Sequence, residues 1–68
     1  MGALTPLQTL KFDTADAVSE HLRRVGARAQ HKHDRPERRV YVSSSRHWIL
    51  ISRSGAGFRA DYYRSCPC

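Results

Sequence analysis

The chain has 68 residues, of which 26% are charged and 40% hydrophobic, which suits one small folded domain rather than a disordered segment. Its apolar stretches are all shorter than the roughly 20 residues that cross a membrane, and its first residues lack the charged start and apolar run of a secretory signal. We therefore expect a cytoplasmic protein with no membrane partner, in which both cysteines are thiols.

The net charge of +6 is concentrated in the second half of the chain. Residues 1–37 carry six basic and five acidic side chains, a net charge of +1, whereas residues 38–68 carry six arginines and only Asp61, a net charge of +5. Arginine forms paired hydrogen bonds to phosphate and stacks on bases, and a concentrated positive field attracts polyanions. This distribution predicts nucleic acid, or an acidic or nucleoprotein surface, as the partner.

The first half of the chain predicts one strand and one helix. Residues 5–12, TPLQTLKF, form a short strand or an arm. Apolar residues then recur at spacings of three and four, which predicts an amphipathic helix over about residues 14–25. Asp13 is expected to cap the N-terminus of this helix, and Gly26 to end it in a left-handed conformation.

The second half predicts strands. The stretch ARAQHKH permits an edge strand or a flexible loop, and HDRPE reads as a turn. The segments RVYVS, HWILIS and GFRADYYR that follow are rich in β-branched and aromatic residues. The expected fold is one α+β domain over residues 1–68, with the helix on one face of a three- to five-stranded antiparallel sheet. Residues 1–6 form a flexible arm in this prediction, and residues 65–68 a frayed tail.

Hairpin register decides which side chains share a face of this sheet. A two-residue turn at Gly55 and Ala56 pairs Ile49 with Tyr62. A four-residue loop over residues 44–47 pairs Val42 with Ile49. The predicted floor for the helix contains Val40, Val42, Ile49, Ile51, Phe58, Ala60 and Tyr62. The predicted opposite face has the rows Arg39, Ser52, Arg59; Tyr41, Leu50, Asp61; and Ser43, Trp48, Tyr63.

That opposite face predicts a binding surface, because one helix cannot cover both sides of the sheet and exposed apolar patches usually mark interaction sites. Aromatic rings rimmed by arginine suit single-stranded nucleic acid, whose bases stack while its backbone follows the cations. The predicted binding residues are Arg39, Tyr41, Trp48, Leu50, Arg53, Arg59, Tyr63 and Arg64.

Two other interpretations of this face stay open at the level of sequence. Trp, Tyr and Arg are also the residues of protein interfaces, so the partner is alternatively a host protein complex or a second copy in a homodimer. In the other interpretation, the N-terminal segment covers Trp48 and Leu50 and forms a second small core. In overall build, the chain resembles small RNA- or DNA-binding modules, and equally the small proteins with which phages and mobile elements disable host machinery, anti-CRISPR proteins among them. The second resemblance implies an inhibitor or adaptor that blocks a host complex.

Cofactors and catalysis are not expected. His31, His33, Cys66 and Cys68 are the residue types that bind zinc, but one residue separates each pair, where zinc ligands are usually two or more apart. The sequence also lacks a nucleophile elbow, a phosphate-binding glycine motif and a recognisable pair of catalytic carboxylates. We therefore predict a non-enzymatic binding protein.

Overall fold

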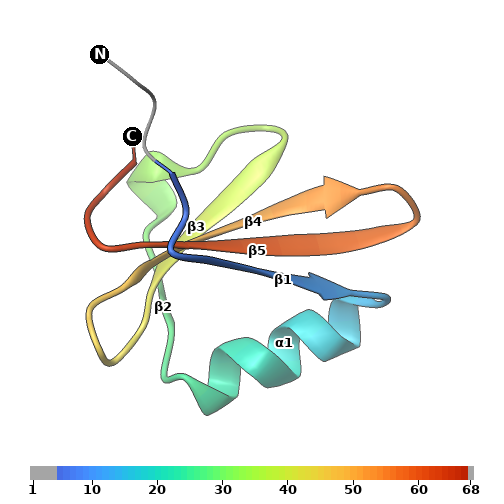
Figure 1. The fold of residues 1–68 in the computed structure, drawn as a ribbon, viewed down its shortest axis with the longest axis horizontal. Coiled ribbons are helices and arrows are strands. Elements are labelled where there is room, and N and C mark those ends of the chain that lie inside the picture. The colour runs from blue at the N-terminus through green and yellow to red at the C-terminus, as the bar shows by residue number, and fades with distance from the viewer. Residues whose placement is uncertain (1–4, 68) are drawn as a thin grey trace.

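The computed structural model describes residues 5–67. One helix, α1 (Ala15–Arg24), packs on a five-stranded antiparallel sheet, which confirms the predicted α+β class. A short 3-10 helix, η1 (His31–His33), lies on the other side of the sheet from α1 (Figure 1). In spatial order, the strands are β1 (Gln8–Phe12), β5 (Gly57–Tyr63), β4 (Trp48–Ser54), β3 (Arg38–Val42) and β2 (Arg28–Ala29).

Helix α1 lies where the sequence predicts it, but its N-cap is Thr14. The Thr14 hydroxyl oxygen accepts a 3.1 Å hydrogen bond from the backbone N–H of Ala17, one of the amides that a helix start leaves unpaired. The prediction of Asp13 as the cap is therefore wrong by one residue, because Thr14 is the last extended residue before the helix. The predicted left-handed end is confirmed at Gly26, which has φ +63°.

The β4–β5 hairpin has the predicted register. Ile49 faces Tyr62 and Arg53 faces Phe58 across the two strands. Gly55 opens the turn with φ +60°, a conformation that glycine adopts without the steric cost of a side chain.

The β3–β4 hairpin differs from the prediction by one residue. Val42 faces Trp48 rather than Ile49, and Val40 faces Leu50 rather than Ile51. The physical reason is a loop shorter than expected. The Ser43 N–H donates to the carbonyl oxygen of His47 at 2.9 Å, and Arg46, inside this three-residue loop, has φ +67°. A left-handed third residue is the usual geometry of such a loop, but here an arginine occupies the place where glycine would have signalled it.

This shift exchanges the two sides of β3. We call the side of the sheet that packs on α1 the helix face, and the opposite side the far face. Arg39 and Tyr41 lie on the helix face beside Ile51 and Ile49, whereas Val40 and Val42 lie on the far face. The predicted floor is correct for β4 and β5 and wrong for β3. The buried core under α1 consists of Val18, Ile49, Ile51 and Ala60.

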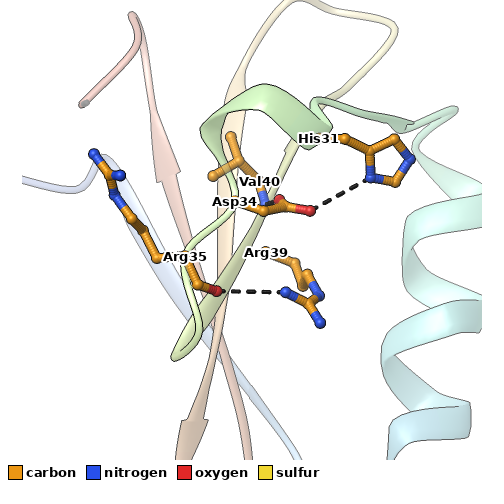
Figure 2. A network of polar contacts seen from close by, with 5 residues as sticks. All are labelled: His31, Asp34, Arg35, Arg39 and Val40. Carbon is orange, nitrogen blue, oxygen red and sulfur yellow. Dashed lines mark hydrogen bonds and ion pairs between the residues drawn. The ribbon is translucent and has the colours of Figure 1, made fainter.

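The outer edge of β3 is closed by hydrogen bonds from the preceding segment rather than by a full neighbouring strand. Strand β2 is two residues long, and beyond it the Asp34 carboxylate accepts from the backbone N–H of Val40 at 2.8 Å. His31 Nδ1 lies 3.4 Å from the other Asp34 oxygen (Figure 2). The Val40 N–H holds the pKa of Asp34 below its ordinary value of 3.8. Asp34 thus satisfies an edge amide that a longer β2 would otherwise pair.

Truncation of Ile49 tests the core assignment. Its side chain is fully buried, at 0% exposure, so Ile49→Ala should lower the free energy of unfolding by about 2–5 kcal/mol. Leu7→Ala removes similar atoms at a position that is 51% exposed, and should change stability by less than about 0.5 kcal/mol. Urea denaturation of both variants measures the difference, and equal losses would contradict this core.

Acid titration of stability tests the Asp34 edge. Because the folded state lowers the Asp34 pKa, ionised Asp34 stabilises the fold above its unfolded pKa, and this contribution disappears as pH falls through the folded pKa. Asp34→Asn keeps an oxygen acceptor for Val40 but cannot ionise, so its unfolding free energy should depend less on pH across the acid range. Glu37→Gln removes a nearby exposed carboxylate and serves as the control. If both variants match the wild-type pH dependence, the ionised Asp34 contact is not important for stability.

Candidate functional site

The structure divides the predicted binding residues between the two faces of the sheet. Trp48, Leu50, Arg59 and Tyr63 lie on the far face, as expected. The predicted partners from the neighbouring strand do not join them, because the register of β3 places Arg39 and Tyr41 on the helix face. Arg53 faces Phe58 on the helix face, and Arg64 follows the end of β5 as an exposed residue.

The far face consists of three cross-strand rows, read from β1 or β5 toward β3. The basic row is Lys11, Arg59, Ser52 and Arg38. The middle row is Thr9, Asp61, Leu50 and Val40. The aromatic row is Tyr63, Trp48 and Val42.

The middle row is a second small core. Val40, Leu50 and Asp61 are only 1%, 6% and 7% exposed, although α1 lies on the other face. Part of the cover on this side comes from η1, since the His33 ring meets the Trp48 ring edge-on at 5.4 Å between centroids. The expectation of an exposed Leu50 is therefore wrong. Leu50 is buried, as the interpretation of a second small core requires, and the contact observed on this side comes from η1. The cover by the N-terminal segment stays a prediction.

Asp61 is a buried carboxylate whose charge is compensated. Its Oδ1 accepts from the Thr9 hydroxyl at 2.6 Å, and its Oδ2 accepts from Nε of Arg59 at 3.0 Å. These contacts tie β1 to β5 and orient Arg59, whose side chain remains 46% exposed. Because Asp61 engages Nε, the two terminal nitrogens of this guanidinium are available as donors to a ligand.

The basic row gathers three cations from three strands at one end of the far face. Adjacent strands lie about 4.8 Å apart, so the row spans about 14 Å from β1 to β3. Lys11 and Arg59 are exposed and Arg38 is half-buried. Sequence reasoning missed Lys11 and Arg38. The β1–β5 pairing would have identified Lys11, and the three-residue Ser43–His47 loop would have identified Arg38.

The residues considered as zinc ligands and judged unsuitable by their spacing have other contacts in the structure. His31 contacts Asp34, and His33 packs on Trp48. Cys66 is disulfide-bonded, so the expectation that it is a thiol is wrong, and Cys68 lies outside the described residues. Within residues 5–67 there is no group of three or more His, Cys, Asp or Glu side chains that could hold a metal ion.

Comparison of the chain with protein-family models, with curated proteins and with solved structures found no match. In the part of the chain that the structure describes, the helices are too short and too polar to cross a membrane. The site is therefore interpreted from its own geometry and charge.

Asp61→Ala tests whether the buried carboxylate links the strands. It removes the acceptor of two hydrogen bonds from a nearly buried position, so it should lower the free energy of unfolding by about 1–3 kcal/mol. Thr9→Val in the Asp61→Ala background should then cost much less than in the wild type. This double-mutant cycle is measured by urea denaturation, and additive losses would show that the two side chains do not interact.

Proposed function

We propose that the protein is a small basic binding protein that engages nucleic acid, free or within a nucleoprotein complex, through the basic row of its far face. The observation that carries this proposal is the alignment of Lys11, Arg59 and Arg38 across three strands, with the Ser52 hydroxyl between the arginines. In this proposal the protein acts by binding rather than by chemistry.

The charge of the row supports a polyanionic partner. Asp61 is the only acidic residue after residue 37, and its carboxylate is already engaged by Thr9 and Arg59. Three like charges along about 14 Å repel one another, and a phosphodiester backbone supplies a matching line of negative charge. Arginine adds directional donors for phosphate oxygens, as the Arg59 geometry illustrates.

The aromatic row supports a single-stranded ligand. Tyr63 and Trp48 are half-buried neighbours at the other end of the far face, about 13 Å from the basic row along the strands. Unpaired bases stack on such rings, whereas a paired duplex keeps its bases inside. The His33 ring already contacts the Trp48 ring. The proposal therefore assigns most of the binding free energy to the basic row and a smaller part to the aromatic rings.

The salt dependence of oligonucleotide binding tests this function. Each phosphate contact contributes about 0.7 to the slope of log affinity against log salt for a single strand. Lys11→Gln combined with Arg59→Gln should therefore reduce the steepness of the slope by about 1.4. Fluorescence anisotropy of a labelled single strand between low and physiological salt gives the slope, and Lys11→Gln alone serves if the double variant is unstable.

The matched control is Arg23→Gln with Arg24→Gln, which removes the same charge from the exposed surface of α1. If both double variants lose the same slope, the binding is general electrostatics and the basic row is not the site. If the folded protein does not bind single strands at low salt, nucleic acid is not its partner. That result would leave the protein-directed inhibitor or adaptor as the better hypothesis.

A further inference from the structure

A second basic feature lies where β4 runs past the start of β3. Strand β3 begins at Arg38, opposite Ser52, while β4 continues to Ser54. The notch beside this overhang is a pocket of about 210 Å³. It is lined by Pro36, Glu37, Arg38, Arg39, Ile51, Ser52, Arg53 and Phe58.

Three arginines and one glutamate line this pocket, so the formal charge of its lining residues is +2. Arg53 lies over the Phe58 ring, 5.6 Å from the ring centre, which holds its guanidinium against the pocket wall. Arg39 donates to the backbone oxygen of Arg35 at 3.4 Å, and its side chain points toward the α1 side of the sheet while that of Arg35 points away (Figure 2).

The Arg38 side chain has a buried hydrogen-bond donor, its Nε atom, that lacks an acceptor among the described residues. A buried donor without a partner is costly, and native structures usually satisfy such groups with protein, water or a ligand. Arg38 also lines the adjacent pocket, so an anion bound there would compensate the charge of its guanidinium.

The volume and the charge of the pocket indicate which class of anion it suits. Pockets that hold whole small molecules usually have about 300–1,000 Å³, so this one suits a single group of a larger ligand. A carboxylate or a backbone phosphodiester carries one negative charge, whereas a phosphomonoester carries about 1.5 to 2 and has three terminal oxygens. The charge of +2 and the separate arginines match the phosphomonoester.

We propose that this pocket binds the terminal phosphate of a nucleic-acid strand. The inference rests on the proposed function and deepens it, because Arg38 and Ser52 belong both to the pocket and to the basic row. Arg39 and Arg53 lie on the helix face, so a strand whose backbone follows Lys11 and Arg59 toward β3 would pass the start of β3, at Arg38, to reach them. The protein thereby prefers strand ends that carry phosphate.

The test compares oligonucleotides that differ only at one end. Two single strands of the same sequence, one with a 5′-phosphate and one with a 5′-hydroxyl, carry a fluorophore at the 3′ end, and a mirrored pair tests the 3′-phosphate. Anisotropy at physiological salt should show about tenfold tighter binding of one phosphorylated end, the effect of one charge-assisted interaction. Equal affinity for phosphate and hydroxyl at both ends would overturn the inference while leaving the proposed function standing.

Variants of the pocket residues test whether the preference for a phosphorylated end comes from the pocket or from general attraction to the additional negative charge. Arg53→Gln and Arg39→Gln, both at exposed positions, should reduce the phosphate preference to less than about threefold with little change for the hydroxyl strand. Arg24→Gln and Lys11→Gln should keep the preference, although Lys11→Gln weakens both strands. Loss of the preference in all four variants would overturn the pocket.

Inorganic phosphate distinguishes the source of the anion. If the pocket holds a terminal phosphate, millimolar phosphate should remove the preference for the phosphorylated strand, whereas chloride at the same ionic strength should not. Binding of inorganic phosphate, detected as a thermal shift that Arg53→Gln abolishes, without any end preference would overturn the assignment to a strand terminus. It would assign the pocket to a free phosphate instead.

Discussion

The register of β3 against β4 determines what both faces of this sheet present, and a loop of three residues sets that register. The Ser43 N–H and the His47 carbonyl close the loop, and Ser44 fastens it to the end of α1, since its N–H and its hydroxyl both donate to the Val25 carbonyl. That carbonyl belongs to the C-cap residue that follows α1, where backbone acceptors lack partners within the helix. The helix end and the hairpin therefore satisfy each other, and a slip of one residue would break both contacts and exchange the faces of β3.

The edges of the sheet show a second constraint, the need to pair backbone groups where the chain is too short for another strand. On the β3 side, β2 supplies two residues, the Gln30 N–H donates to the Val40 carbonyl, and the Asp34 carboxylate accepts from the Val40 N–H. Because these contacts hold η1 against β3, His33 is placed over Trp48 on the far face. The segment that forms hydrogen bonds to the edge of β3 is therefore also the segment that packs on the far face.

The sequence predicted those elements whose apolar residues are compatible with only one arrangement against the core. The period of α1 and the glycine turn between β4 and β5 left little choice, and both are confirmed. Strand β3 is compatible with two registers, because either Val40 or Tyr41 can face the core under the helix. Both sides of β4 also carry a buried residue, Ile49 on the helix face and Leu50 on the far face. The deciding signals were a left-handed arginine and serine hydrogen bonds, which no hydrophobic pattern records. The predicted site therefore kept Trp48, Leu50, Arg59 and Tyr63 on the far face and lost the two residues of β3, Arg39 and Tyr41.

The far face combines a buried row with a row of like charges, and the two depend on each other. A domain of this size has little stability to spare, and adjacent cations on neighbouring strands lower it through repulsion. Asp61 offsets part of that cost from within the middle row, because its carboxylate, 7% exposed, holds Nε of Arg59 beneath the surface. A carboxylate placed in the basic row itself would cancel part of the positive field of that row. From the neighbouring middle row, Asp61 orients the guanidinium through Nε and leaves its terminal nitrogens without a bond to Asp61. The buried polar contact that stabilises β1 on β5 therefore also orients the charge on which the proposed function depends.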